Sequence, residues 1–248
     1  MTREIISSQH PLVKHFVRLR QNHDYRDEHG SVIIEGMKMV SEVCTSHHTK
    51  VILTCDINAI PANVKADEVI VVSEAVMDKV SGVQNPEGII AEVATPKQAS
   101  LKGCKRVIAC DGINDPGNLG TILRTALALG WEGAYILNNS CDPYNDKALR
   151  AGKGATFRLP LARGSWNDLK GLIKDNQWQP VAADVHGIDI REFPRLDKIL
   201  LLLSSEAQGV SEEAASFKKV KIPMPGEMES LNVAAAATIC MYVLRSHE

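Results

Sequence analysis

Short apolar runs alternate with helical patterns through the C-terminal part of this 248-residue chain. Uniformly apolar runs of this length are typical of strands that are buried on both faces. Alternation of such strands with helices predicts an α/β fold, a parallel sheet with helices on each side. We expect strands at 106–110, 133–137, 180–183, 198–203 and 220–222, and helices at 119–129, 166–175, 211–215 and 232–245.

A smaller α/β unit is predicted before this sheet. Its expected helices are 11–20, 37–44 and 74–80, and its expected strands are 31–35, 51–54, 69–72 and 88–93. Polar, irregular sequence follows, which is typical of a linker. The sequence therefore predicts a domain over 1–95, a linker over 96–104 and a second domain over 105–248.

The cysteines and histidines indicate neither a disulfide framework nor a metal site. Six cysteines are scattered without a C-x-x-C pair, and no H-E-x-x-H is present. We interpret His47 and His48 as residues at a helix C-terminus, where the helix dipole favours positive charge. The N-terminus lacks the apolar core of a signal peptide, and the apolar run 231–244 is too short to span a membrane. We expect a cytoplasmic protein with no membrane and no metal partner, or an organellar one with its targeting segment absent.

Local charge points to a polyanion more than the net charge of −2 does. The stretch 147–165 carries five basic residues and no acid, and 9–22 carries three basic residues and two histidines, again without an acid. One such run alone is more often a solvated face. Two of them in a mildly acidic protein favour contact with nucleic acid.

Three segments, 114–124, 204–209 and 222–232, combine Gly, Pro, Asn or Ser at places where a predicted strand meets a loop. Loops at the ends of parallel strands are where open α/β sheets bind ligands. The segments lack both G-x-G-x-x-G and the Gly-Lys-Ser/Thr of a P-loop, which disfavours a dinucleotide or a nucleoside triphosphate. They predict a polar small-molecule pocket with a reactive edge.

Four polar residues in these segments have structural or functional interpretations. Arg124 falls in an otherwise apolar helical stretch, where an arginine is costly unless it meets an anion or lines a cleft. Glu206 fits a helix cap and a site role about equally. Ser230 fits a helix N-cap, whereas Asn232, two residues further along, is harder to explain as one.

Together the segments resemble the three motifs of the SpoU (TrmH-like) branch of the SPOUT RNA methyltransferases. The matching residues are Asn118-x-Gly120-x-x-x-Arg124, Glu206-x-x-Gly209, and Ile222-Pro-Met224 with Ser230-Leu-Asn232-Val. The order and spacing of the set are specific, although each motif alone is weak. The stretch 150–160 resembles the segment between the family's first two motifs. The N-terminal unit is similar to a ribosomal-protein-like substrate-binding domain.

The resemblance implies a trefoil-knotted α/β domain, a homodimer, S-adenosylmethionine as cofactor, and methylation of a ribose 2′-hydroxyl in RNA, ribosomal more than transfer RNA. It assigns catalysis to Asn118, Arg124, Glu206 and Asn232. It assigns the cofactor to Leu203, Ser204, Gly209, Ile222, Met224 and Leu231. It assigns RNA binding to Lys14, Arg18, Arg150, Lys153 and Arg158, the last three as phosphate contacts.

One position departs from the family pattern. Ser204 stands where family members commonly have glycine, so its side chain either crowds the cofactor or donates a hydrogen bond to it. Two rival functions also stay open: methylation of a base nitrogen, as in a neighbouring SPOUT branch, and RNA binding without catalysis. The motif-one arginine favours ribose over a base nitrogen, and the set of Arg124, Glu206 and Asn232 favours an enzyme over a binding protein.

Overall fold

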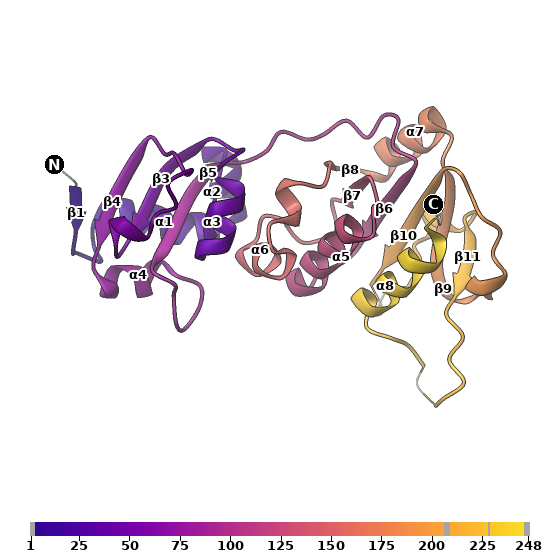
Figure 1. The fold of residues 1–248 in the computed structure, drawn as a ribbon. Helices are drawn as coiled ribbons and strands as arrows, with labels where there is room; N and C mark the ends of the chain where they lie inside the picture. Colours follow the sequence, from indigo (N-terminus) through magenta and orange to yellow (C-terminus); the bar gives the residue numbers. More distant parts are fainter. Residues whose placement is uncertain (1–2, 206–208, 228, 246–248) are drawn as a thin grey trace. The chain divides into compact units, whose positions relative to one another are not determined.

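The computed structural model describes residues 3–205, 209–227 and 229–245 (Figure 1). The chain divides into two compact units. One comprises Met1–Lys97 with Tyr144–Arg150, and the other comprises Gln98–Pro143 with Ala151–Glu248.

The first unit is a five-stranded mixed sheet in the order β1-β4-β3-β5-β2. Its strands are β1 Arg3–Ile5, β2 Ser31–Glu35, β3 Thr49–Thr54, β4 Glu68–Val72 and β5 Ile89–Ala94. Its helices are α1 Pro11–Gln21, α2 His23–His29, α3 Met37–Val43 and α4 Glu74–Val80, with a 3-10 turn η1 Ile57–Ala59. Strand β5 runs antiparallel to both β2 and β3. The sequence predicted neither β1 nor α2.

One face of this sheet holds the unit's core. Phe16 and Leu19 of α1 and Val76 of α4 are fully buried against Ile70 and Ile90 of the sheet. Apolar residues at helical spacing along 11–20 produce this contact, because they lie on one face of α1. The helix therefore carries its polar residues, Lys14 and Arg18, exposed.

The second unit is a six-stranded sheet in the order β11-β9-β10-β6-β7-β8, and every pairing in it is parallel. Its strands are β6 Arg106–Asp111, β7 Gly133–Leu137, β8 Leu161–Gly164, β9 Gln179–Asp189, β10 Ile199–Ser204 and β11 Lys218–Lys221. Its helices are α5 Pro116–Ala128, α7 Trp166–Asn176 and α8 Val233–Leu244, with 3-10 turns η2 Ala155–Phe157, η3 Ile190–Glu192 and η4 Glu212–Ala214. Helix α6, Asp146–Gly152, lies mostly in the part of the chain grouped with the first unit.

Two apolar cores cover the two faces of this sheet. Helices α5 and α8 bury Ile122, Leu123 and Ala237 on one face, and α7 buries Leu169 on the other. The central strand β10 has five fully buried residues in a row, 199–203. The predicted parallel sheet covered on both faces is confirmed.

Helix α8 is tied to the rest of the unit by Trp131. Its ring lies in the same core as α8, and its indole nitrogen donates to the backbone carbonyl of Met241 at 3.2 Å. Figure 1 shows α8 beside α5 on one side of the sheet.

Strand β9 is much longer than the predicted 180–183. Its second half carries Asp184, His186 and Gly187, which broke the apolar pattern. A Cβ at Gly187 would lie 2.5 Å from the backbone of Lys219 and Val220, where β11 has a register shift. Glycine is therefore needed for β11 to approach. The predicted helix 211–215 was also wrong, since only the single turn η4 forms there.

Candidate active site

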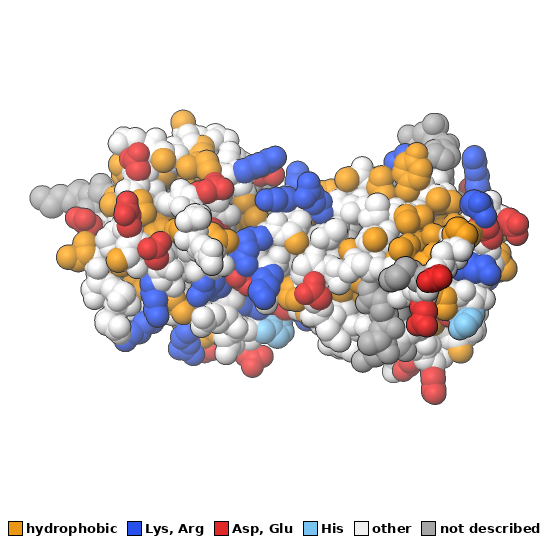
Figure 2. Space-filling view, turned by 90° about the horizontal axis from the view of Figure 1, so that it is seen from below, with side chains coloured by type: hydrophobic (Ala, Val, Ile, Leu, Met, Phe, Trp, Pro, Cys, Tyr) orange, Lys and Arg blue, Asp and Glu red, His pale blue; other side chains and the backbone are white. Residues whose placement is uncertain are grey.

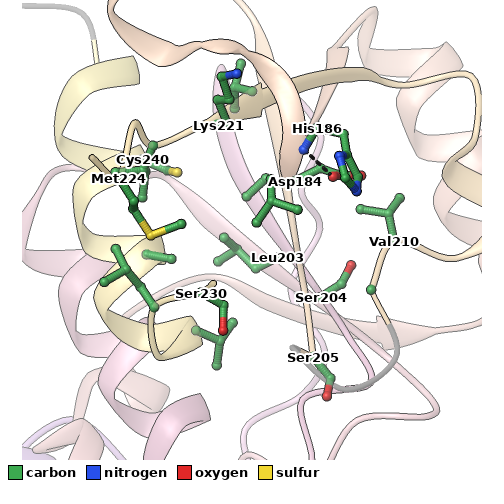
Figure 3. A pocket seen from close by; sticks show the side chains of 18 residues that line it. Asp184, His186, Leu203, Ser204, Ser205, Val210, Lys221, Met224, Ser230 and Cys240 are labelled. Carbon is green, nitrogen blue, oxygen red and sulfur yellow. Dashed lines mark hydrogen bonds between the residues drawn. The ribbon is translucent and has the colours of Figure 1, made fainter. Parts of the chain in front are cut away.

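A cavity of about 400 Å³ opens at the carboxyl-terminal parts of β9, β10 and β11 (Figure 3). This is the edge at which open parallel sheets bind ligands, and the volume lies in the range of small-molecule sites. Its walls come from 183–186 of β9, 203–205 at the end of β10, 209–210, 220–222, Met224, 230–231 and, on α8, Val233, Ala236 and Cys240.

The cavity collects the residues that the sequence assigned to the cofactor. Leu203, Ser204, Gly209, Ile222, Met224 and Leu231 all line it. They come from two segments that meet only in the folded chain. Gly209 has a left-handed φ of 66°, which glycine adopts without strain, and its amide donates to the carbonyl of Ser205 at 2.9 Å.

Ser204 brings a polar group into this mostly apolar wall. Its hydroxyl oxygen is buried and, within the described residues, has no hydrogen-bond partner. An unpaired buried hydroxyl costs about 1–3 kcal/mol. In Figure 3 the Ser204 side chain lies among the lining residues, near Val210 and Leu203. A ligand with an acceptor there would satisfy it, so the wall fits a polar cofactor.

The loop after β6 is held against the end of β10. Asn139 donates to the buried carboxylate of Asp111 at 2.7 Å and accepts from the amide of Gly112 at 3.2 Å. The amide of Ser205 donates to the carbonyl of Asp111 at 3.2 Å. These bonds fix where the first motif begins relative to the cavity wall.

The first and third motifs meet through two amide side chains. Asn232 donates from Nδ2 to Oδ1 of Asn118 at 3.1 Å. Asn232 is also the N-cap of α8, since its Oδ1 accepts from the amides of Ala234 and Ala235 at 3.0 and 3.3 Å. The interpretation that Ser230 caps this helix and Asn232 lies inside it was wrong. Ser230 instead lines the cavity.

Arg124 does not line this cavity. It is exposed on α5, while Leu119, Ile122, Leu123 and Ala126 face the core, so the expectation of an arginine on the apolar face was wrong. It borders a second, open groove with Thr125, Ala128, Leu129, Thr238, Ile239 and Tyr242. Among the described residues it has no ion-pair or hydrogen-bond partner. Glu206, the remaining predicted catalytic residue, lies outside the described residues.

The predicted RNA-binding residues are mostly exposed. Lys14, Lys153 and Arg158 have exposed side chains, and Arg18 lies over the ring of Tyr25 at 3.9 Å. Arg150 is half-buried and pairs with Asp146 at 2.8 Å. Lys153 has a left-handed φ of 48° next to Gly154, which turns the chain sharply after α6. Figure 2 shows Lys and Arg side chains on one face of each unit, interspersed with acids.

The lining residues that sequence reasoning did not assign to the cofactor include Asp184, His186, Val210 and Cys240. The first two belong to the half of β9 that was not predicted, and Cys240 is a buried α8 residue without a polar signal. Burial raises the pKa of the Cys240 thiol to about 12, so the cavity side of α8 presents a neutral group.

Asp184 is held as a carboxylate at the edge of this cavity. It lines the cavity from β9 with its side chain only 11% exposed. Burial disfavours its charge, but hydrogen bonds from Lys219 and the His186 amide, with the charge of Lys219, outweigh that cost and hold its pKa below the usual range. Asp184 is therefore ionised at neutral pH.

Neither a metal site nor a membrane helix is found in the part of the chain that the structure covers. No cluster of three or more His, Cys, Asp or Glu side chains is placed to hold a metal ion there. No helix there combines the length and the hydrophobicity that crossing a membrane requires.

Comparison with known proteins identifies the family. Residues 105–242 match the SpoU rRNA methylase family. The chain belongs to this family. Residues 10–91 match the MRM3-like substrate binding domain. Family membership makes the chain an S-adenosylmethionine-dependent ribose 2′-O-methyltransferase of RNA, as the motifs predicted.

Two relatives are similar in sequence. The 23S rRNA (guanosine(2553)-2′-O)-methyltransferase RlmP of Bacillus subtilis is 30% identical over 98% of this chain and 99% of its own length. The 23S rRNA (adenosine(1067)-2′-O)-methyltransferase of Streptomyces azureus is 33% identical over 62% of this chain and 60% of its own.

A solved structure extends the likeness to the fold. The AdoMet-bound rRNA methyltransferase from Sinorhizobium meliloti is 28% identical and superposes with a TM-score of 0.87. The match covers 98% of this chain and 97% of that one.

Proposed function

We propose that this methyltransferase acts on ribosomal RNA, at a nucleotide that its N-terminal unit selects. Two relatives named above act on 23S rRNA, at a guanosine and at an adenosine. Because the two relatives modify different nucleotides, they do not indicate which base this chain selects. The match of 10–91 to a substrate-binding domain supports the role of the first unit. We assign substrate binding to 1–95, a linker to 96–104 and catalysis to 105–248, in the cytoplasm with the ribosome.

The cavity at β9, β10 and β11 is the proposed cofactor site. Its size, the unpaired Ser204 hydroxyl and the mixture of apolar and polar walls fit a nucleoside-containing ligand. When bound, S-adenosylmethionine supplies a methyl group already activated on a sulfonium. Leu203, Ser204, Gly209, Ile222, Met224 and Leu231 would hold it, and the knotted crossing implied by the family would close the chain around it.

The contact between Asn118 and Asn232 carries the catalytic proposal. It brings the first and third motifs together directly beside Ser230 and Leu231, which line the cavity. Polar groups placed there orient the ribose acceptor next to the methyl donor. Glu206 would complete this set.

Arg124 handles the charge that develops on the acceptor. A guanidinium stays protonated in proteins, so it cannot remove the 2′-hydroxyl proton itself. It can grip the adjacent phosphate with two parallel hydrogen bonds and stabilise the forming alkoxide, whose proton passes to water at this exposed face. Its exposure and the lack of a partner among the described residues leave its donors available.

A homodimer is the proposed functional form. Ile239, Tyr242 and Val243 are exposed apolar residues on α8, and Ile239 and Tyr242 line the groove that Arg124 borders. Exposed apolar patches of this kind mark interaction sites. A second copy of the chain, docked on the α5–α8 groove, would cover them and would place Arg124 at the interface. Figure 2 shows hydrophobic side chains gathered on one face of the second unit.

The test is single-turnover transfer of labelled methyl to unmodified ribosomal RNA and, separately, to transfer RNA, followed by nuclease digestion to locate the label. We expect the label on a ribose 2′-oxygen of ribosomal RNA. Arg124→Ala should abolish transfer with cofactor affinity nearly unchanged, and Arg124→Lys should restore little, because an ammonium lacks the planar grip. Label on a base, or near-native turnover by Arg124→Ala, would refute the assignment.

Lys153→Ala is the matched control for general RNA binding. Lys153 is exposed and is not among the residues that line the cavity. Its loss should weaken RNA binding and lower the salt slope by about one. The rate at saturating RNA should stay largely preserved.

A further inference from the structure

The β9 wall of the cavity carries an ionised carboxylate that the motifs do not explain. Asp184 accepts from Lys219 Nζ at 2.7 Å and from the backbone amide of His186 at 2.9 Å. These are its only hydrogen-bond donors among the described residues. A carboxylate offers about four acceptor positions, so two are unused. Burying such a group against an apolar cavity is costly unless a ligand pairs with it.

The two hydrogen bonds of Asp184 have a structural explanation, but they use only half of the acceptor positions of its carboxylate. The His186 bond closes a local turn, and the Lys219 bond ties β9 to β11 beside the close approach at Gly187. Neither contact requires the side chain to line the cavity, as it does. In Figure 3 Asp184 and His186 lie together on one wall.

The position of Asp184 decides which part of the cofactor it meets. The reactive methyl must face the acceptor, which Asn118 and Asn232 orient, and Ser230 and Leu231 bring that side of the cavity to Asn232. Asp184 lies on a different wall from Ser230 (Figure 3). The β9 wall therefore faces a part of the cofactor away from the methyl, either the nucleoside or the amino-acid end.

We propose that Asp184 accepts hydrogen bonds from the ribose hydroxyls of the cofactor and so selects a nucleoside with an intact diol. The inference rests on the proposed function, because it takes this cavity as the cofactor site. A carboxylate that accepts from ribose hydroxyls is a general device of nucleotide sites. The charge of Asp184 is already balanced by Lys219, so a neutral diol suits it better than the sulfonium or the ammonium.

The test is calorimetry on the full chain with two neutral ligands, S-adenosylhomocysteine and its 2′,3′-dideoxy analogue. The native protein should bind the dideoxy analogue on the order of tenfold more weakly, the range expected for hydrogen bonds to a charged group. Asp184→Asn should weaken the binding of S-adenosylhomocysteine by a similar factor. It should change the affinity for the dideoxy analogue by no more than about twofold. Asp189→Asn, on the same strand but outside the cavity, should change neither.

Several outcomes would overturn the inference. Equal affinity of the native protein for both ligands removes the diol preference, whatever the variants do. If Asp184→Asn loses the same affinity for both ligands, the role of Asp184 is purely structural. A loss with S-adenosylmethionine but none with S-adenosylhomocysteine shows that Asp184 binds the cation.

Failure of the cofactor site itself is distinguishable. Met224→Arg, which fills the cavity, should abolish binding of both ligands. If it binds them like the native protein, the proposed cofactor site is wrong and the role of Asp184 falls with it. If Met224→Arg abolishes binding but the native protein shows no diol preference, only the role of Asp184 is overturned.

Discussion

The side-chain amide of Asn232 donates to the side-chain carbonyl of Asn118 at 3.1 Å, across 114 positions of sequence. The same Asn232 caps α8 through the amides of Ala234 and Ala235. One side chain thus fixes the start of α8 and joins it to the first turn of α5. This arrangement sets the spacing between the motif that carries Arg124 and the motif that lines the cavity.

The two asparagines should separate stability from catalysis. Asn232→Ala loses the cap and should lower the free energy of unfolding by about 1 kcal/mol, whereas Asn118→Ala should cost less because its side chain caps nothing. Both should slow methyl transfer at saturating cofactor. Thermal unfolding and single-turnover rates measure the two effects. Native rates in Asn118→Ala would show that the contact only holds the fold together.

The sequence predicted much of this site because its chemistry is concentrated in loops with strong local signals. The motif residues of the third segment and Ser204 were placed at a strand end by the apolar runs beside them, and the structure brings them to one cavity. Asp184 was missed because Asp184, His186 and Gly187 end the apolar run on which the predicted strand 180–183 rested, and Asp and Gly are typical of loops. Asn232 was misplaced because helix boundaries shift by one or two residues.

Long-range placement was the other limit. The sequence pattern put Arg124 in an otherwise apolar helix, but did not show that Arg124 points away from the core toward a groove shared with α8. Such pairing of helices depends on packing between residues far apart in sequence, which a local pattern does not encode.

Ser204→Ala should make the free protein more stable and its cofactor complex weaker. The buried Ser204 hydroxyl has no partner within the described residues, so its removal relieves a penalty in the free protein. If the cofactor supplies the partner, the same change should cost about 1 kcal/mol of binding, roughly a fivefold loss of affinity. Unfolding and calorimetric titration test both arms. Tighter binding by Ser204→Ala, or by Ser204→Gly, would mean that the side chain crowds the cofactor.

The N-terminal unit should lose stability in acid through Glu92. This carboxylate is buried at 3.2 Å from His15 and 3.8 Å from Lys50. Burial of Glu92 opposes its negative charge. Hydrogen bonds from His15 and Ser31, with the charges of His15 and Lys50, outweigh that cost and hold the pKa of Glu92 below its ordinary value of 4.5. A lowered folded pKa contributes stability above pH 4.5, which is lost as the pH falls through the folded value.

Glu92→Gln should therefore unfold at a lower temperature than the native protein at pH 7, and the gap should narrow as the pH falls below 4.5. Removing one partner of a buried ion pair lowers the free energy of unfolding by about 3–5 kcal/mol. The loss in Glu92→Gln should be smaller, because the isosteric amide keeps part of the hydrogen bonding. Glu68→Gln, which breaks the exposed pair with Arg3, is the control and should change little. A gap that stays constant with pH would contradict the assignment to ionisation.

Tyr242→Arg should convert the proposed dimer into a monomer. Tyr242 is 50% exposed in the α5–α8 groove, and a charge there would be buried without a partner at an interface between two copies. Light scattering at low micromolar concentration should give twice 27.1 kDa for the native protein and about half of that total for the variant. Lys170→Glu, on helix α7, serves as a surface control. A monomeric native protein would rule out the dimer.

The same groove predicts that Arg124 acts on the cavity of the partner. In its own chain Arg124 borders the groove on α5 and α8 and is absent from the cavity wall. Mixing Arg124→Ala with Met224→Arg, each inactive alone, should then restore transfer. Random exchange makes half of the dimers mixed, and each mixed dimer holds one complete site of two, so about a quarter of native activity should return in a two-fold symmetric assembly. Adding Tyr242→Arg to both chains should abolish the recovery. No recovery from stable mixed dimers would show instead that Arg124 serves the cavity of its own chain.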